Sequence, residues 1–293
     1  MRCAERAIHA ADGRLLSMFT AGRPEDDCVF VLHGTPGVRE MFKPELAEGA
    51  RRDLRYIAYS RPGYGGSDRQ PGRLVRDCAS DVGAIANQIG VERFFVIGES
   101  GGGPHALACA ALLPDRVRAV ALVASPAPPV MEGWEHGMGK GNIEELRAAR
   151  EGPDALRIHL ENEIQGLDVI KTVTQLRNAL DKHLDDPDRV VFDGGYGAFL
   201  LTAWKQIAEE GIWGWFDDDL ALYGDWGFEL DDAVVPVTVW QGDSDRIAPL
   251  SHGRWLANNL ANADLRLLAG VGHISLVADG YGAILDALMA SDI

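Results

Sequence analysis

Short apolar runs alternate with amphipathic stretches along the first 126 residues. Residues 8–18 are typical of two strands joined by an Asp-Gly hairpin turn. Further apolar runs of strand length are separated by glycine-rich turns and by segments with helical spacing. The expected strands are 28–32, 54–59, 93–97 and 117–123, and the expected helices are 74–89 and 105–113. This alternation predicts an α/β protein with a parallel sheet and helices on both of its faces.

The alternation stops at about residue 127 and returns after residue 230. Between these points the periodicity is helical and no segment has the pattern of a strand. The expected helices there are 142–150, 153–184 and 189–210. Beyond them, the expected strands are 237–241 and 265–268, and the expected helices are 251–260 and 276–289. We therefore predict a core domain made of residues 1–126 and 231–293, with residues 127–230 inserted as a helical subdomain.

Negative charge is concentrated in the predicted insertion. Residues 127–230 hold 21 Asp or Glu and 9 Lys or Arg, which accounts for −12 of the chain's net charge of −16. They also hold five of the seven tryptophans. Nucleic acid and anionic membrane surfaces both attract basic patches, so an acidic chain argues against either partner. The remaining composition is that of a globular protein, with 46% hydrophobic residues.

The four cysteines are scattered, with no Cys-x-x-Cys pair and no histidine at metal-ligand spacing. We expect free thiols and no metal site, as is typical of a protein in a reducing compartment. The first six residues lack the long apolar stretch of a signal peptide. No apolar run approaches the ~18 residues of a membrane span. These features predict a cytoplasmic protein without a membrane segment, and they say nothing about its oligomeric state.

The first candidate catalytic motif is Gly98-Glu99-Ser100-Gly101-Gly102. The pattern G-x-S-x-G alone is weak, because it also describes ordinary turns. Here it stands between an apolar run of strand length and an Ala- and Leu-rich helical segment, which is the context of a nucleophile elbow. A strand that turns sharply into a helix forces the central residue into a strained conformation, and glycine neighbours avoid a Cβ clash. We therefore predict that Ser100 is a nucleophile.

A serine hydroxyl needs a general base, and the base needs an orienting acid. Asp243 and Asp245 come directly after the expected strand 237–241, and His273 follows the next expected strand. The carboxyl ends of parallel strands meet at one edge of a sheet, so separation along the chain is no obstacle. We predict His273 as the base and Asp245 as its partner, with Asp243 as the competing acid that could instead cap a turn.

The other seven histidines are expected to take no part in catalysis. His33 lies in a glycine-rich turn and is expected to shape that loop, and His105 is expected to pack or form hydrogen bonds on the helix after Ser100. Solvated positions are expected for the rest, which are His9, His136, His159, His183 and His252.

Negative charge develops on a substrate's carbonyl oxygen when serine attacks, and two backbone N–H groups are expected to receive it. One is the N–H of Gly101, directly after the nucleophile. The other is expected from the turn His33-Gly34-Thr35-Pro36-Gly37, with Thr35 favoured and Gly34 as the alternative.

Taken together, these motifs resemble those of the α/β-hydrolase fold superfamily, in the branch that includes proline iminopeptidases, small esterases and C–C hydrolases. The matching segments are His33 to Gly37, Arg61-Pro62-Gly63-Tyr64-Gly65-Gly66-Ser67, Gly98 to Gly102, Gly242-x-x-Asp245 and Gly272-His273. The resemblance implies an eight-stranded, mostly parallel sheet with a helical cap inserted after the sixth strand. The insertion at 127–230 fits that place.

Departures from the family's patterns narrow the set of reactions expected of this chain. Haloalkane dehalogenases and epoxide hydrolases of this fold use an aspartate nucleophile, whereas this chain has Ser100. Proline iminopeptidases usually carry His-Gly-Gly-Pro-Gly and a Trp after the nucleophile, whereas this chain has Thr35 and Gly101 there. The leading hypothesis is a serine esterase that cleaves a small-molecule carboxylic ester through an acyl-enzyme, without a cofactor. The alternatives are an iminopeptidase-like aminopeptidase and a ligand-binding or receptor-like protein on a hydrolase fold.

Aromatic residues of the predicted cap are candidates for a pocket wall, because ligand pockets are mostly apolar and aromatic. We expect Trp204, Trp213 and Trp215 to contact substrate. Cap carboxylates could hold a substrate amine, but an acidic run such as Asp217-Asp218-Asp219 is expected to be a solvated face. The local excess of carboxylates predicts neutral or cationic substrates.

Overall fold

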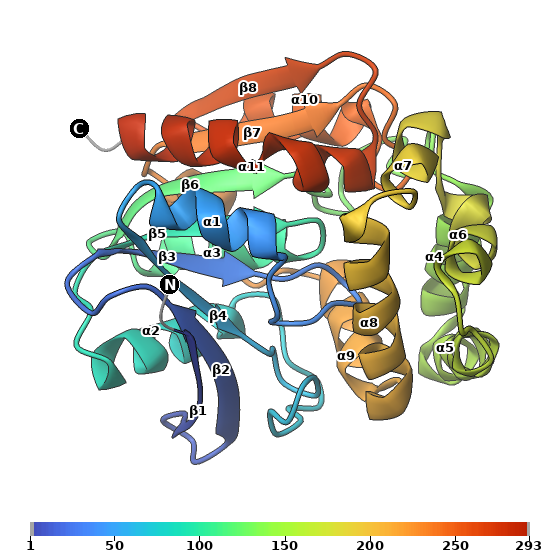
Figure 1. Ribbon diagram of the computed structural model, residues 1–293, viewed down its shortest axis with the longest axis horizontal. Coiled ribbons are helices and arrows are strands. Elements are labelled where there is room, and N and C mark those ends of the chain that lie inside the picture. The colour runs from blue at the N-terminus through green and yellow to red at the C-terminus, as the bar shows by residue number, and fades with distance from the viewer. Residues whose placement is uncertain (1–2, 292–293) are drawn as a thin grey trace.

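One eight-stranded sheet organises the computed structural model, which describes residues 3–291 (Figure 1). The strands are β1 (Cys3–His9), β2 (Leu15–Ala21), β3 (Asp27–Leu32), β4 (Leu54–Tyr59), β5 (Phe94–Glu99), β6 (Val117–Val123), β7 (Val237–Gly242) and β8 (Ala263–Leu268). Their order in the sheet is β1-β2-β4-β3-β5-β6-β7-β8. The hairpin β1–β2 is antiparallel and joins β4 antiparallel, whereas β4, β3, β5, β6, β7 and β8 run parallel. The predicted mostly parallel sheet is confirmed.

Helices cover both faces of this sheet (Figure 1). On one face, α1 (Lys43–Ala50) packs on β4 and α11 (His273–Ala290) packs on β6 and β7. On the other face lie α2 (Asp77–Gln88), α3 (Gly102–Leu112) and α10 (Leu250–Asn259). None of the helices within residues 3–291 is both long and apolar enough to cross a membrane.

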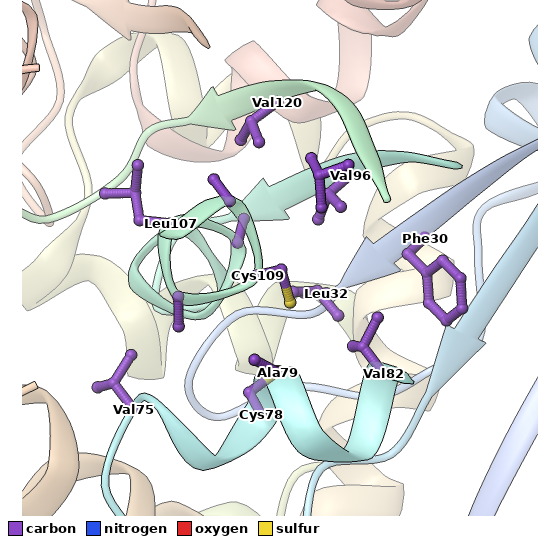
Figure 2. Close-up of a cluster of buried hydrophobic side chains, with 14 of the residues drawn as sticks. Phe30, Leu32, Val75, Cys78, Ala79, Val82, Val96, Leu107, Cys109 and Val120 are labelled. Atoms are coloured by element: carbon purple, nitrogen blue, oxygen red, sulfur yellow. The ribbon is translucent and has the colours of Figure 1, made fainter. Parts of the chain in front are cut away.

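Alternate side chains of the central strands enter two different cores, because successive residues of a strand point to opposite faces. In β3, Phe30 and Leu32 join the core under α2 and α3, whereas Val29 and Val31 join the core under α1 and α11. Figure 2 shows the first of these cores, with side chains of α2 and α3 packed against those of β3, β5 and β6. Burial of each such apolar side chain stabilises the fold by roughly 1.5–3 kcal/mol. Two faces covered by helices explain why these strands read as continuous apolar runs.

Residues 127–230, here called the β6–β7 segment, run from the end of β6 towards β7 without adding a strand. The segment holds α4 (Lys140–Glu151), α5 (Pro153–Asp168), α6 (Val173–Leu180), α7 (Asp186–Val191), α8 (Gly195–Glu210) and α9 (Trp213–Leu222), with short 3₁₀ turns at Asp181–His183 and Leu230–Asp232. In Figure 1 these helices gather beyond the carboxyl ends of the parallel strands. The segment therefore lies over the edge of the sheet at which the predicted catalytic residues follow the ends of strands.

The helix predicted at 153–184 is two helices in the structure. The break lies at Thr172, whose hydroxyl accepts the N–H of Gln175 while the Gln175 side chain accepts the N–H of Thr172. This reciprocal cap starts α6 afresh. The helix predicted at 189–210 is likewise interrupted, because α7 ends at Val191 and α8 begins after Gly194.

Some residues of the β6–β7 segment belong to the core under α2 and α3. Trp134 and Trp226 pack in the same cluster as α2 and α3. Trp134 also lies against His252, whose ring accepts the N–H of Ala127 and contacts the carbonyl of Trp134. The expectation that His252 is solvated is wrong, because its side chain is fully buried between two parts of the chain.

The acidic run Asp217-Asp218-Asp219 is also not a solvated face. It lies on α9, and all three side chains are buried. The sequence pattern suggested exposure because charged residues are seldom buried without a partner. Here the partners come from far along the chain, as Arg69 pairs with Asp217 and Arg61 pairs with Asp218.

Candidate active site

Ser100 sits at the turn from β5 into α3, in the strained backbone conformation that its motif predicts. Its φ is +51°, which is uncommon for a residue other than glycine. Its N–H donates to the carbonyl of Val123, 2.8 Å away at the end of β6. The turn is closed by glycines: a Cβ at Gly98 would lie 2.6 Å from the Gly102 carbonyl oxygen, and a Cβ at Gly102 would lie 2.0 Å from that of Leu32. This geometry projects the Ser100 side chain from the end of the strand.

The structure brings His273 and Asp245 together. His273 is the first residue of α11, and its Nδ1 lies 2.8 Å from Asp245 Oδ2. The other carboxylate oxygen, Oδ1, accepts the N–H groups of Ile247 and Ala248. Asp243 instead stays exposed and accepts from Ser244 and from the N–H of Gly270. Of the two predicted acids, only Asp245 reaches the histidine.

The surroundings of His273 favour its protonated form. Burial alone would lower the pKa of the imidazole, because burial disfavours the charged ring. The charge and hydrogen bond of Asp245 outweigh this effect, and Asp188 and Glu99 act in the same direction. The pKa of His273 therefore lies above its ordinary value.

Asp188 is a neighbour of this histidine that sequence reasoning missed. It belongs to α7 of the β6–β7 segment, and its side chain is fully buried. Its carboxylate accepts three consecutive backbone N–H groups at the start of α11, those of His273, Ile274 and Ser275. An Asp near the start of a helix is common, and nothing in the local sequence indicates that this one serves a different helix.

The two predicted oxyanion donors converge beside Ser100. A Cβ at Gly101 would lie 3.1 Å from the backbone nitrogen of Thr35, so the Thr35 turn passes close to the start of α3. Gly34, the alternative donor, is also near, because a Cβ there would lie 3.3 Å from Ser100 Cβ. Within residues 3–291, neither the N–H of Gly101 nor that of Thr35 donates a hydrogen bond to the protein. Both remain available to an oxygen atom.

A buried ionic cluster supports the Thr35 turn from below. The Thr35 hydroxyl donates to Asp218 Oδ2 at 2.8 Å, and Arg61 donates to the Gly34 carbonyl at 2.8 Å and to the Thr35 hydroxyl at 3.0 Å. Arg73 also pairs with Asp218. Burial would raise the pKa of Asp218, but the charges of Arg61 and Arg73 hold it well below its ordinary value. The cluster is therefore charged, and it fixes the turn through side chains of α9 and the core.

His33 has the loop-shaping place expected of it. Its Nδ1 contacts the Gly34 carbonyl at 2.8 Å, and its Nε2 accepts the N–H of Arg61 at 3.1 Å. Burial, followed by the charge of Arg61, lowers the pKa of His33 well below its ordinary value. The His33 ring is thus neutral, and both of its nitrogens contact backbone groups. His105 is similarly buried on α3, with its Nδ1 2.8 Å from the Gly101 carbonyl.

A cavity of about 410 Å³ opens at these residues. Ser100, His273 and Thr35 line it from the core, and Trp204 and Trp215 line it from the β6–β7 segment. Apolar neighbours from the segment include Leu167, Leu180, Leu184, Phe199, Leu200 and Ile207. Mostly apolar walls with a few polar groups are typical of a site that binds a small molecule.

Trp213 does not line the cavity, unlike the other two tryptophans predicted to contact substrate. Its side chain is 42% exposed, and the Arg69 guanidinium stacks 3.9 Å from the centre of its ring. Trp213 is the first residue of α9, whereas Trp215 points inward and donates from its indole to Glu145 at 3.1 Å. The two residues are separated by one position, which places them on different sides of the helix.

Several carboxyl groups also line the cavity. Burial raises the pKa of Glu99 to about 7, and it raises the pKa of Glu145 to about 7 as well. Burial and the nearby charge of Glu99 raise the pKa of Glu45 well above its ordinary value. Glu163 is paired with Lys182 at 2.6 Å. The cavity is acidic, but with pKa values of about 7 the carboxyl groups of Glu99 and Glu145 are only partly ionised near neutral pH.

The described residues offer no metal site. Between Cys3 and Ser291, no group of three or more His, Cys, Asp or Glu side chains is arranged so that it could hold a metal ion. The described cysteines are free, and Cys28, Cys78 and Cys109 are buried.

Known proteins resemble this chain in sequence and in fold. A family model described as the α/β hydrolase fold matches residues 27–146. An AB hydrolase superfamily protein, YisY of Bacillus subtilis, is 26% identical over 259 residues, which is 86% of this chain and 85% of that protein. A pimeloyl-[acyl-carrier protein] methyl ester esterase of Chromobacterium violaceum is 30% identical over 216 residues, covering 72% of this chain and 74% of that protein.

Among solved structures, a thermophilic esterase of Thermogutta terrifontis has a TM-score of 0.70 at 18% identity. The likeness covers 99% of this chain and 100% of the esterase chain, and it supports the assignment of the fold. Together with the parallel sheet, the strained serine turn and the sequence relatives, it leads to one conclusion. The chain is a hydrolase of the α/β-hydrolase superfamily.

Proposed function

We propose that the protein is a serine hydrolase that cleaves a small carboxylic ester through an acyl-enzyme intermediate. Ser100 is the nucleophile, His273 the general base and Asp245 the acid that orients it. The observation that carries the proposal is the 2.8 Å contact between His273 Nδ1 and Asp245 Oδ2, at a cavity that His273 and Ser100 both line. A base held by a buried acid, at a cavity that a strained serine also lines, is an arrangement suited to serine hydrolysis.

In the first half of the reaction, Ser100 Oγ attacks the carbonyl carbon of the ester. Asp245 occupies Nδ1 of His273, which leaves Nε2 to take the proton of the Ser100 hydroxyl. The carbonyl oxygen becomes negative, and the N–H groups of Gly101 and Thr35 stabilise it. When the tetrahedral intermediate collapses, the bond to the alkoxide oxygen breaks. The proton on Nε2 passes to that oxygen, and an alcohol leaves.

The second half repeats these steps with water. His273 Nε2 takes a proton from a water molecule, whose oxygen attacks the acyl carbon bound to Ser100. The same two N–H groups receive the oxyanion. Collapse breaks the bond to Ser100 Oγ, which regains the proton from Nε2, and a carboxylic acid is released. The mechanism needs no cofactor.

An ester is the preferred bond on two grounds. The Chromobacterium relative is named as a methyl ester esterase, which supports the same bond class here. The cavity walls are mostly apolar, and they suit an acyl or alcohol part without charge. Five glutamates line the cavity, Glu40, Glu45, Glu99, Glu145 and Glu163, and those that are ionised disfavour a substrate that carries a negative charge.

An aminopeptidase of the iminopeptidase type is the second candidate. Glu145 and Glu163 line the cavity from the β6–β7 segment, where they could contact a substrate ammonium group. The pairing of Glu163 with Lys182 and the raised pKa of Glu145 weaken this reading, because both reduce the negative charge available. Ester hydrolysis therefore remains the better supported reaction.

The test is active-site labelling followed by a substrate panel. A fluorophosphonate probe should modify Ser100, as read by mass spectrometry of the digested protein, and a His273→Ala variant should lose most of the labelling. An unlabelled Ser100 in the folded wild-type protein would favour a binding protein instead. Turnover should then be measured on matched short-chain esters, lactones, thioesters and alanyl or prolyl anilides. Faster cleavage of the anilides than of the esters would favour the aminopeptidase.

A further inference from the structure

The catalytic histidine proposed above is held by a residue outside its core domain. We propose that Asp188 of the β6–β7 segment is a positioning residue, which fixes the backbone of His273 and supports the charge that His273 acquires during each proton transfer. This inference rests on the proposed role of His273.

The first argument is geometric. Asp188 Oδ2 accepts the N–H of His273 at 3.0 Å, and Oδ1 accepts the N–H groups of Ile274 and Ser275, both at 2.9 Å. The Ser275 hydroxyl is a fourth donor to this carboxylate, 3.0 Å from Oδ1. A single carboxylate thus holds the whole first turn of α11, including the backbone that carries the imidazole.

The Asp188 carboxylate lies directly against the backbone of Gly272. A Cβ at Gly272 would lie 2.4 Å from Asp188 Oδ1, so the residue before His273 must be a glycine for the carboxylate to approach. The Gly272 N–H in turn donates to the Ser275 hydroxyl at 2.8 Å. The Gly272-His273 pair noted in the sequence therefore serves this contact as well as the turn itself.

The second argument is electrostatic. The N-terminus of a helix carries partial positive charge, which opposes a second positive charge on an imidazole at its first residue. α11 is 18 residues long, and His273 opens it. A buried carboxylate on the same N–H groups offsets this opposition. His273 thus has carboxyl groups from three elements around it, and each raises its pKa: Asp245 after β7, Glu99 at the end of β5 and Asp188 of α7.

Each of these three carboxyl groups has a distinct relation to the ring. Asp245 bonds Nδ1 directly, and Glu99 acts through space from the cavity. Asp188 touches only the backbone of the histidine. Asp188 alone comes from the β6–β7 segment, so it makes the basicity of the core's histidine depend on the placement of that segment.

The experiment compares Asp188→Asn with two matched controls by the pH dependence of kcat/KM for a neutral ester. The Asn side chain keeps an oxygen acceptor for the first turn of α11 and removes the charge. We expect the midpoint of the acidic limb to fall by roughly 0.5–1 pH unit, because the protonated imidazole loses a stabilising charge. We also expect the plateau value to fall about 10- to 100-fold, because the imidazole is held less firmly.

Asp186→Asn is the control for charge, since Asp186 lies on the same helix but its side chain is 91% exposed and pairs with Arg189. Ser275→Ala is the control for stability, because it removes two hydrogen bonds from the same turn and leaves the Asp188 charge in place. Neither variant should move the acidic midpoint. A purely structural Asp188 would instead make Asp188→Asn behave as Ser275→Ala does, with a lower Tm and an unchanged midpoint, and would overturn the proposal.

Two further readouts separate this proposal from the proposed function. If wild-type protein is not labelled at Ser100 and shows no acidic limb, the serine mechanism itself fails. If both are present and Asp188→Asn keeps the wild-type midpoint, only the role of Asp188 fails. Should Asp188→Asn not fold, Asp188→Ser offers a smaller neutral acceptor for the same N–H groups. If circular dichroism showed both variants unfolded, Asp188 would be a structural cap and the proposal would be wrong.

Discussion

Arg61 and Asp218 form an ion pair that is shut off from solvent. Arg61 Nη2 lies 2.5 Å from Asp218 Oδ2, and the two side chains are 1% and 0% exposed. Arg61 follows β4 in the core, whereas Asp218 lies on α9 of the β6–β7 segment. The same guanidinium donates to the Gly34 carbonyl and the Thr35 hydroxyl, so the pair also sets the position of the proposed oxyanion turn.

Replacing Asp218 should therefore destabilise the fold and the turn together. Asp218→Asn leaves Arg61 and Arg73 buried without a counter-charge, and we expect a loss of about 3–5 kcal/mol in the free energy of unfolding. Asp217→Asn is the matched control on the same helix. Its partner Arg69 is 31% exposed and can turn to water, so the loss there should be about 1 kcal/mol or less. Urea denaturation followed by tryptophan fluorescence measures both, and equal losses would contradict the assigned role of the cluster.

Ser100→Ala should abolish most of the activity and leave the fold intact. Without the nucleophile only binding and the oxyanion donors remain, and kcat should fall by roughly 10³-fold or more. The variant should keep the wild-type Tm within a few degrees. Near-normal ester turnover by this folded variant would refute Ser100 as the nucleophile.

The two candidate acids should differ sharply in their effect. Asp245→Asn removes the charge that holds Nδ1 of His273, and kcat should drop by about 10⁴-fold. Asp243→Asn affects only an exposed turn that contains Ser244 and Gly270, and its activity should stay close to that of the wild type. Steady-state kinetics on one ester decides the matter, since the reverse ranking would assign the acid to Asp243.

The pH profile should show the raised pKa of His273. The imidazole must be neutral to accept a proton, so kcat/KM should be low in acid and rise as His273 loses its proton. Because Asp245, Asp188 and Glu99 together raise the pKa of this ring, the midpoint should lie above 6.5, the ordinary value for histidine. A midpoint below 6.5 would show that burial outweighs the three carboxyl groups.

Substrate charge should matter more at low salt than at high salt. In a series of esters that differ only in a remote group, we expect kcat/KM to be roughly 10-fold lower for an anionic member than for a neutral one at low ionic strength. The difference should shrink at higher salt, since exposed charges are screened beyond about 10 Å at 0.1 M. If the two members are cleaved equally well at low salt, the acidic cavity has no part in substrate choice.

The order of elements follows from the sequence because it depends on local patterns. The strand predicted at 117–123 has those bounds in the structure, and Ser100 occupies the predicted turn between β5 and α3. Apolar runs and glycine turns are properties of adjacent residues, so periodicity detects them. The short helix α9 lacked such a pattern, because its buried residues include three aspartates beside Trp215 and Phe216 rather than regularly spaced aliphatic residues.

Burial of charge could not be predicted in the same way. Asp188 and Asp218 lie in acidic stretches that look solvated, and their partners are Ser275, Arg61 and Arg73, which are far away along the chain. Whether a carboxylate is buried depends on donors that the fold brings to it, and no local pattern contains that information. The sequence therefore indicated the candidate nucleophile, base and acid, but not the residues that hold them in place.

The contacts of Asp188 and Asp218 bear on attempts to build chimeras from this protein. Grafting the β6–β7 segment onto a related core, or replacing it with another protein's, is an obvious way to alter specificity. Each graft would also have to supply a carboxylate for the first turn of α11 and another for Arg61 and Arg73. If a new segment lacked the second carboxylate, the side chains of Arg61 and Arg73 would be buried in the core without a counter-charge. The segment and the core are interdependent parts, and they would have to be exchanged or evolved with their partner residues.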